Sequence, residues 1–247
     1  MAELAIIGGT GLTRLPAFIE LRREAVETAW GRPSSDLIHG RLYGADIVFI
    51  ARHGEQHTIP PHRINYRANI QALKDAGVGS IIAAAAVGGI RADLGPCKLC
   101  VPHQLIDYSH GRAGTFFEDD LAHVTHIDFS QPYTPALRER LLDAGVRAGL
   151  RVVDGGVYGC TQGPRLETPA EITRMERDGC DVVGMTGMPE AALAREAGLD
   201  YACCAVVANW AAGKTDRDIS MAEIEDNLRL GMADLARLLQ ALLAPLA

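Results

Sequence analysis

The chain has 247 residues, of which 48% are hydrophobic and 22% charged, as is ordinary for a globular protein in water. Its net charge of −7 excludes the basic surface that nucleic acid or an anionic membrane requires, so an anionic substrate would have to be bound by a few placed donors. No run approaches the ~18 apolar residues of a membrane span, and the acidic start "MAELAIIGGTG" is unlike a signal peptide, so we expect a cytoplasmic protein.

Strand-like runs alternate with helical patterns along the chain, which predicts an α/β fold with a central mixed, largely parallel sheet flanked by helices. No composition shift marks a linker, so we expect a single domain over residues 1–247. The predicted strands are residues 4–7, 46–51, 80–87, 99–107, 151–160, 181–185 and 201–208. The predicted helices are residues 65–76, 135–148, 169–177, 189–197 and 220–243. The last helix is the clearest, because Ser220 and Glu223 form a capping-box pattern ahead of apolar residues at helical spacing.

Small or hydrogen-bonding residues follow most of the predicted strands. In chain order they read "GGTG", "RHGEQH", "GG", "TQGPRLET", "TGMPE" and "NW". Ligands of open α/β sheets bind beyond the carboxyl ends of the strands. The sequence therefore predicts a binding site built from these strand ends.

The first strand end, "IIGGTGLT", has glycines that let a backbone approach an anion, with the Thr10 hydroxyl as a further donor. It is not a Walker A loop, and Arg14 stands where a dinucleotide-binding motif has its third glycine. A tight turn without a ligand is an equal alternative.

The second strand end presents Arg52 and His53, two donors suited to phosphate. A zinc site built on His53 and His57 is the rival interpretation, although the sequence between them is not the H-E-x-x-H of zinc proteases and nearby Gly54 opposes a helix. The third interpretation is that Arg52 forms an ordinary surface ion pair. Phosphate is favoured.

Later strand ends add Glu167, a carboxylate at the mouth of a pocket, Thr186, a hydroxyl for an anion, and Met185, which suits an apolar sugar face. Taken singly, Glu167 is as well explained as an exposed loop acid and Met185 as a core residue. The six cysteines include the pair Cys97 and Cys100, but no partners stand at zinc-finger spacing, so we expect reduced packing residues and no metal site.

Several of these stretches together resemble one enzyme family. The stretches "IIGGTG", "ARHGEQHTIPPHRINYRANIQALK", "GPRLETPAE" and "GMTGMPEAALAREAGL" keep the order and spacing of the trimeric purine nucleoside phosphorylase and methylthioadenosine phosphorylase family, from about Ala5 to the final helix. The resemblance implies reversible phosphorolysis of a purine nucleoside to a free base and a ribose 1-phosphate. It implies inorganic phosphate as co-substrate, no metal or organic cofactor, and a homotrimer.

The resemblance also implies roles for individual residues. Met185 matches the methionine against the ribose, and His126 matches a residue that a neighbouring subunit lends to the site. The residues that match phosphate ligands are Thr10, Arg52, His53, Thr186 and, through its backbone amide, Ala86.

This chain differs from the methylthioadenosine branch at positions that contact the purine base in that branch. That branch ends its last strand in two aspartates, where this chain has Asn209 and Ala211, and the 6-oxopurine branch resembles this chain in Glu167 and Asn209. An ionised Glu167 accepts the N1–H of hypoxanthine, whereas adenine N1 is itself an acceptor. Such a mismatch costs about 1–3 kcal/mol. Leu166 stands where the family usually stacks an aromatic ring on the base.

The residues expected at the 5′ end of the substrate decide between a 5′-hydroxyl and a 5′-methylthio group. Inosine and guanosine phosphorylases resemble each other in a histidine for the 5′-hydroxyl, where this chain has Met221, with Ile224 one turn on. An apolar wall suits a methylthio group, although both residues could instead be the core face of the last helix. We expect phosphorolysis of S-methyl-5′-thioinosine to hypoxanthine and 5-methylthioribose 1-phosphate, with Asn209, Glu167 and His53 as catalytic residues. Methylthioadenosine, inosine or guanosine phosphorolysis, a zinc hydrolase and a non-catalytic nucleoside-binding protein are the alternatives.

Overall fold

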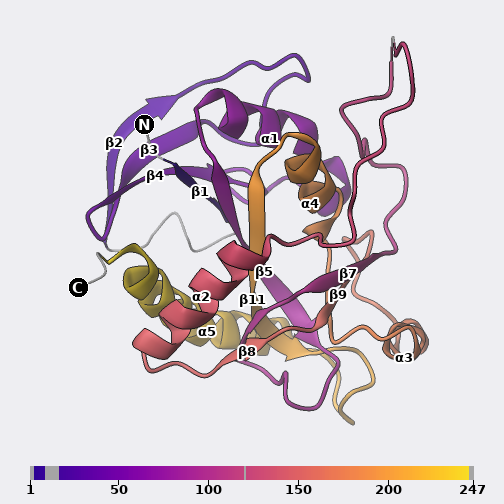
Figure 1. The fold of residues 1–247 in the computed structure, drawn as a ribbon. Coiled ribbons are helices and arrows are strands. Elements are labelled where there is room, and N and C mark those ends of the chain that lie inside the picture. Colours follow the sequence, from indigo (N-terminus) through magenta and orange to yellow (C-terminus); the bar gives the residue numbers. More distant parts are fainter. Residues whose placement is uncertain (1–2, 9–16, 120, 245–247) are drawn as a thin grey trace.

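The computed structural model describes residues 3–8, 17–119 and 121–244. Within these ranges eleven strands form one sheet with helices on both faces (Figure 1). The strands are β1 (Leu4–Gly8), β2 (Phe18–Glu24), β3 (Leu37–Leu42), β4 (Ala45–Ala51), β5 (Ser80–Gly89), β6 (Leu99–Val101), β7 (Gln104–Asp107), β8 (Val152–Asp154), β9 (Val157–Cys160), β10 (Val182–Gly184) and β11 (Asp200–Trp210). The helices are α1 (Tyr66–Asp75), α2 (Pro135–Arg147), α3 (Pro169–Arg177), α4 (Gly187–Glu196) and α5 (Met221–Leu243), with a short 3₁₀ helix at Pro61–Arg63.

The sheet is mixed and largely parallel, as the sequence predicts. One path through it runs β2-β3-β4-β1-β5-β10-β9-β7. A branch leaves this path at β5, where β11 pairs with β5 and β6, and β6 pairs with β8. β5 runs parallel to β1 and to β11, while β10 pairs with its last residues in the antiparallel sense. The antiparallel β2–β3–β4 pairs close one edge. β5 is thus the central strand, with three different neighbours.

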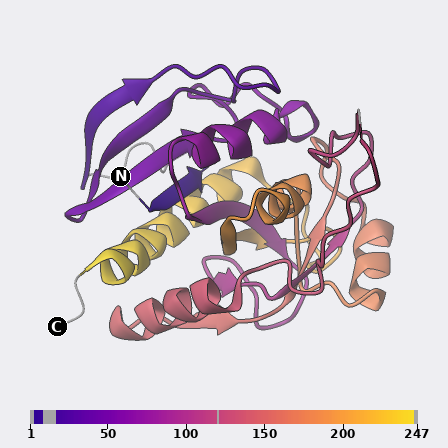
Figure 2. The same ribbon diagram turned by 45° about the horizontal axis from the view of Figure 1, so that its top comes forward.

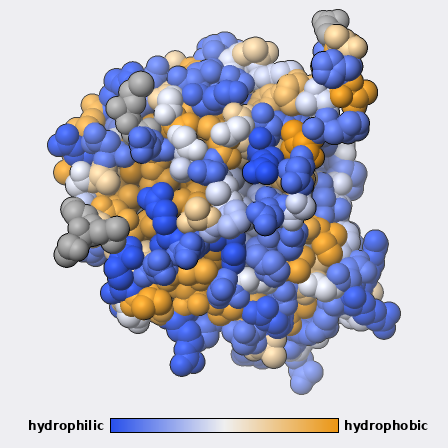
Figure 3. Space-filling view, in the orientation of Figure 1, coloured by the Kyte–Doolittle hydropathy of each residue, from blue (hydrophilic) through white to orange (hydrophobic). Residues whose placement is uncertain are grey.

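The core lies in two layers, one on each face of the sheet. Alternate residues of β5 enter different layers: Ile81 and Ala83 pack in the layer that includes α1 and α4, and Ile82 and Ala84 pack in the layer that includes α2 and α5. Figures 1 and 2 show α1 and α4 on one side of the sheet and α2 and α5 on the other. Apolar side chains also gather on the outside around α2 and α5 (Figure 3).

Polar side chains fix where the helices begin. The Asn65 side chain accepts the Ala68 N–H at the start of α1. A complete capping box formed by Thr168 and Glu171 starts α3. For α5 one half of the predicted box is observed, in which Ser220 accepts the Glu223 N–H, while the Glu223 carboxylate pairs with Arg217.

Three strand predictions were incomplete. The predicted strand 99–107 is interrupted at Pro102, which has no N–H for a ladder, and becomes β6 and β7. The predicted strand 151–160 is interrupted at Gly155 and Gly156, whose φ angles of 83° and 110° are foreign to a strand, and becomes β8 and β9. The hairpin of β2 and β3 was not predicted at all.

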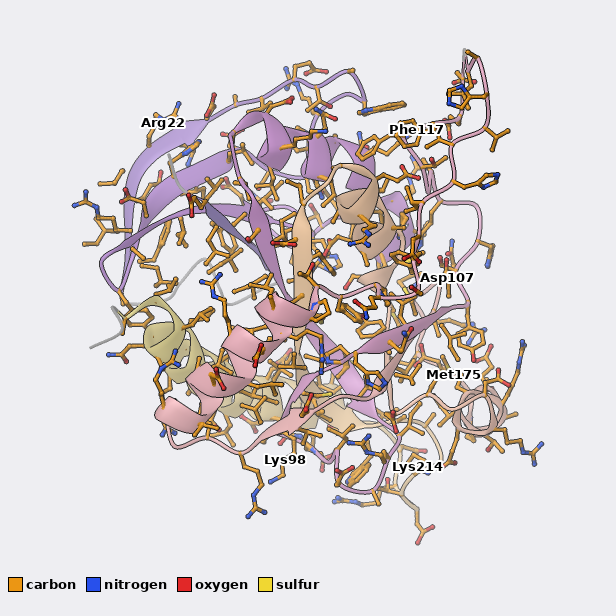
Figure 4. All side chains as sticks on the ribbon, in the orientation of Figure 1. Arg22, Lys98, Asp107, Phe117, Met175 and Lys214 are labelled. Carbon is orange, nitrogen blue, oxygen red and sulfur yellow. The ribbon has the colours of Figure 1, made fainter. Side chains whose placement is uncertain are left out.

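A segment between β7 and α2, residues 108–134, contains no helix or strand among its described residues and projects from the body (Figures 1 and 3). Its base is held firmly. Glu196 accepts from Thr115 and the Phe116 N–H, and Arg67 pairs with Glu118. Phe117 and Asp107 are labelled on this side of the molecule in Figure 4. None of the described helices is both long and apolar enough to cross a membrane.

Candidate active site

A cavity of about 440 Å³ opens where the ends of β4, β5, β10 and β11 meet the first half of α5. Most of the predicted site residues, although far apart in the sequence, line this one cavity. They are Arg52, His53, Ala86, Leu166, Glu167, Met185, Thr186, Asn209, Met221 and Ile224. The expected meeting of strand ends is therefore found, while the role of each residue stays a prediction.

Two predicted site residues are missing from this set of cavity-lining residues, for different reasons. His126 is exposed on the projecting segment and does not line the cavity. Thr10 lies outside the described residues.

The floor of the cavity is a stretch of β5 at which the strand changes neighbours. β1 pairs with β5 only as far as Ala83, and β10 begins to pair at Gly88. Between these points one edge of β5 is open, and Ala86 is exposed although the residues beside it are buried. Backbone N–H and C=O groups on an open edge need partners, so this stretch can bind a ligand through its main chain.

Arg52 is almost fully buried, with 2% of its surface exposed, and is held by a carboxylate that the sequence analysis did not assign. Its Nε and Nη2 donate to the two Glu190 oxygens at 2.6 and 2.7 Å, and Nη1 donates to the Ala84 carbonyl at 2.9 Å. The Tyr201 hydroxyl also donates to Glu190. Arg52 is thus not a surface ion-pair residue, and three of its five N–H groups are already bonded. One N–H on each terminal nitrogen is left for a ligand.

This pairing decides the charge of the site. Burial opposes the charge of Arg52, but the Glu190 carboxylate raises the pKa of Arg52 above its ordinary value, so the guanidinium stays cationic. The pair as a whole is neutral. An anion bound here meets directed N–H donors rather than a net positive charge.

His53 is placed differently from the simple donor that the sequence suggests. Its Nδ1 donates to the Ile59 carbonyl at 2.9 Å, since a carbonyl can only accept. Burial, with a further contribution from the Arg52 charge, lowers the pKa of His53 to about 4. The ring is therefore neutral near pH 7 with Nε2 as an acceptor, which suits the O–H of a protonated phosphate oxygen.

The zinc interpretation finds no ligand set in the described part of the chain. The His53 and His57 rings lie 4.7 Å apart between centroids and are tilted by 50°. Across residues 3–8, 17–119 and 121–244, no three His, Cys, Asp or Glu side chains are grouped closely enough to hold a metal ion.

Thr186 occupies the N-cap position of α4, is 7% exposed and makes no capping bond with its side chain. Met188 has non-helical backbone angles, so the start of this helix is loosened next to the cavity. The Thr186 hydroxyl is thus left for a ligand in the cavity that Arg52 also lines, whereas the Thr186 and Met188 N–H groups donate to the Tyr158 hydroxyl and to Cys160 Sγ.

Two further hydrogen-bonding side chains, those of Glu167 and Asn209, line the cavity. Glu167 is half-buried and its Oε1 accepts from the Thr161 hydroxyl at 2.6 Å, which leaves Oε2 for a ligand. Asn209 donates from Nδ2 to the Trp210 carbonyl at 2.7 Å, which leaves its oxygen and a second N–H. Leu166 beside them is 41% exposed, at the rim of the cavity.

The wall of the cavity that α5 forms is apolar. Met221 is 62% exposed and stands at the first position of α5, followed by Ile224, Leu228 and Met232 at helical spacing. The buried core face of α5 lies further on, around Leu235 and beyond. Met221 and Ile224 both line the cavity, and Met221 is too exposed to belong to the core face.

Arg112, at the root of the projecting segment, was missed by the sequence analysis. Its guanidinium donates to the carbonyls of Thr161, Gln162, Met185 and Met188. It therefore ties the loop that carries Glu167 to the turn between β10 and α4. A single arginine in a loop gives no sequence signal for such a role.

These features define a class of protein. Residues 3–244 match the Phosphorylase superfamily, and the chain belongs to this superfamily. The family resemblance and the fold predicted from sequence are confirmed by this match and by the solved structures below.

The most informative relatives extend over nearly the whole chain. A probable S-methyl-5′-thioinosine phosphorylase from Pseudomonas syringae pv. tomato is 57% identical over 245 residues, covering 98% of this chain and 100% of the relative. A probable 6-oxopurine nucleoside phosphorylase from Thermococcus kodakarensis is 43% identical over 229 residues, covering 91% and 85%. Among solved structures, methylthioadenosine phosphorylase from Schistosoma mansoni with adenine superposes with a TM-score of 0.93 at 30% identity, covering 98% and 91%.

Proposed function

We propose that this chain catalyses the reversible phosphorolysis of S-methyl-5′-thioinosine to hypoxanthine and 5-methylthioribose 1-phosphate, as a purine salvage enzyme of the pentosyltransferase type. The observation that carries the proposal is one cavity lined both by a carboxylate and an amide and by an apolar helix face. The similarity to relatives named as probable S-methyl-5′-thioinosine phosphorylases supports it.

At the base end, Glu167 accepts the N1–H of a 6-oxopurine. Thr161 already satisfies one of its oxygens, which orients the other. Asn209 donates its remaining N–H to O6 or N7, where negative charge builds as the base departs. A 6-aminopurine would place its N1 lone pair against Glu167, which costs about 1–3 kcal/mol.

At the sugar end, the apolar side chains of Met221 and Ile224 take the methylthio group, and Met185 lies against the ribose. A 5′-hydroxyl in the same place would be left without a partner, since α5 presents no polar side chain to this wall of the cavity.

Phosphate binds beneath the sugar between Arg52, His53, Thr186, the backbone amide of Ala86 and Thr10. The glycosidic C–N bond breaks early, the ribosyl group gains oxocarbenium character, and a phosphate oxygen forms the new bond at C1′. Hypoxanthine leaves with the electron pair of the broken bond and takes up a proton, which balances the proton that hydrogen phosphate releases on becoming the sugar phosphate. Positioning and fixed dipoles supply the rate enhancement, so no protein nucleophile, metal or organic cofactor takes part.

The same proposal includes the setting of the enzyme. Residues 1–247 act as one phosphorylase domain, the protein is cytoplasmic, and it works as a homotrimer in which His126 reaches a neighbour's site. The exposed position of His126 on a firmly based projection supports the last point.

The test is a comparison of kcat/KM for S-methyl-5′-thioinosine, methylthioadenosine and inosine in phosphate buffer. We expect S-methyl-5′-thioinosine to be the fastest by at least about tenfold. Faster methylthioadenosine cleavage would refute the roles of Glu167 and Asn209, and faster inosine cleavage the role of Met221. Cleavage without phosphate that a chelator abolishes would favour the zinc hydrolase, and ligand binding without cleavage the binding protein.

A further inference from the structure

Asn209 faces the cavity only because β11 contains an irregularity. Along β5 and β11, Val207 pairs with Val87, and the next pairing joins Asn209 to Gly88. Ala208 is therefore an extra residue in β11. In a regular strand Asn209 would share the face of Val207, away from Val206, but the extra residue moves it to the face of Val206 that lines the cavity.

The extra residue leaves the Ala208 carbonyl in need of a partner, and α5 supplies one. The Asn227 side chain donates from Nδ2 to the Ala208 carbonyl at 2.9 Å. On either side the strand is held by other means, since Val207 exchanges backbone bonds with Cys97 and Lys98, and Ala211 donates to Gly89.

The other end of the Asn227 amide is held as well. Its Oδ1 accepts from the Cys97 thiol at 3.4 Å between Sγ and oxygen. Cys97 has a φ of 67°, an uncommon conformation for a residue with a side chain, at a turn next to Lys98, which is labelled in Figure 4. With both ends of the amide bonded, its nitrogen stays directed at Ala208.

We propose that Asn227 is a positioning residue, which holds the irregularity at Ala208 and thereby directs the Asn209 amide at the purine. Asn227 is not among the residues that line the 440 Å³ cavity, so we take it to act on Asn209 and not on the substrate. The inference rests on the proposed function in that it takes Asn209 to contact the base. The inference extends the proposed function, because it assigns the orientation of the base-contacting amide to a strand irregularity that a side chain of α5 holds in place.

The test is a double-mutant cycle of Asn227→Asp and Asn209→Ala. The aspartate keeps the shape of Asn227 but turns the donor into an acceptor facing a carbonyl. We expect Asn227→Asp to lower kcat/KM for S-methyl-5′-thioinosine about tenfold when Asn209 is present, and by less than about twofold in the Asn209→Ala background. The KM for phosphate should be unchanged in both. Equal losses in both backgrounds would overturn the inference, as would no loss in either.

Asp226→Asn is the matched control, since Asp226 lies one residue earlier on α5 and its carboxylate pairs with exposed Arg229 on the same helix. It should leave both constants within about twofold. Should Asn227→Asp fold poorly, Asn227→Leu keeps the volume, removes the donor and is expected to give the same cycle.

Crystal structures without ligand separate this inference from the proposed function. In the Asn227→Asp variant the Asn209 side chain should leave the cavity, or β11 should regain regular pairing at Ala208. An unmoved Asn209 would refute the inference whichever nucleoside the enzyme cleaves. Failure of wild type to cleave S-methyl-5′-thioinosine with a displaced Asn209 in the variant would refute only the proposed function.

Discussion

In the proposed function Asn209 and Glu167 present opposite hydrogen-bonding character to the purine edge, since the Asn209 N–H donates and the carboxylate accepts. Replacing Asn209 by aspartate makes both groups acceptors. We expect Asn209→Asp to shift the ratio of kcat/KM for methylthioadenosine over S-methyl-5′-thioinosine by about ten- to hundredfold, because the new carboxylate accepts from a 6-amino group and repels O6. Steady-state rates with the two nucleosides measure the ratio.

Asn209→Ala is the control for this experiment, since it removes the amide without adding a charge and should slow both nucleosides. An unchanged ratio in the aspartate variant would mean that Asn209 does not contact the base.

Met221 offers a second residue-scale experiment, because its 62% exposure allows a polar replacement with little loss of stability. Met221→His supplies a partner for a 5′-hydroxyl. We expect it to raise kcat/KM for inosine relative to S-methyl-5′-thioinosine about tenfold. Leu230→His, at a 51% exposed position on α5 outside the cavity, is the matched control and should leave the ratio as in wild type. The same ratio in both variants would discredit the apolar 5′ wall.

At the residue scale, the sequence predicted which residues line the cavity where they stand at the ends of strands. Arg52 and Thr186 follow β4 and β10 and Asn209 lies among the last paired residues of β11, so their meeting at one cavity could be predicted. The Arg52 pair could not, since its partner Glu190 lies 138 residues away. Nor could the neutral state of His53, which depends on burial and on the Ile59 carbonyl. Motifs give the residues of a site, but only the fold gives their charges.

At the scale of elements, α5 packs on β11 with unusually little space at Gly231. A Cβ added to Gly231 would lie 2.3 Å from Val206 Cγ1, and the short valine side chain cannot swing aside. We expect Gly231→Ala to lower the free energy of unfolding by about 1–2 kcal/mol despite the better helix propensity of alanine. Denaturation in urea measures this change.

Val206→Ala combined with Gly231→Ala should cost less than the sum of the two single changes, because the smaller strand residue gives room for the new methyl group. A Gly231→Ala variant more stable than wild type would contradict the close packing.

Elements were predictable where a hydrophobic pattern was strong and uninterrupted. The helices and the buried β1, β4, β5 and β11 follow from such patterns. β2 was missed because its "FIELRRE" is exposed along most of its length and therefore lacks the apolar signal of a core strand. The prediction of one continuous strand over residues 99–107 was wrong, because a hydrophobic pattern does not show that Pro102 lacks the N–H for a strand hydrogen bond.

At the scale of the whole molecule, His53 links stability to pH. Its pKa is about 4 in the folded protein against an ordinary value of 6.5. Between these values the unfolded chain binds the proton and the folded chain does not, so the free energy of unfolding falls as the pH drops from 6.5 toward 4. By pH 5 the contribution lost is about 2 kcal/mol.

His53→Gln removes this titration, so its unfolding free energy should fall less than that of wild type between pH 7 and pH 5. Urea denaturation in phosphate-free buffer checks the difference. Parallel pH curves for the two proteins would show that His53 is not buried as a neutral ring.

The residues proposed to bind phosphate and most of those proposed to bind the nucleoside come from different pieces of chain. Arg52 and His53 follow β4, Ala86 lies on β5 and Thr186 precedes α4, whereas Asn209 lies on β11 and Met221 and Ile224 lie on α5. If these residues act as proposed, substitutions late in the chain can change the nucleoside preference without touching the residues proposed to bind phosphate. Exchanging the segment from β11 into α5 between relatives, together with residue 167, should then transfer the preference.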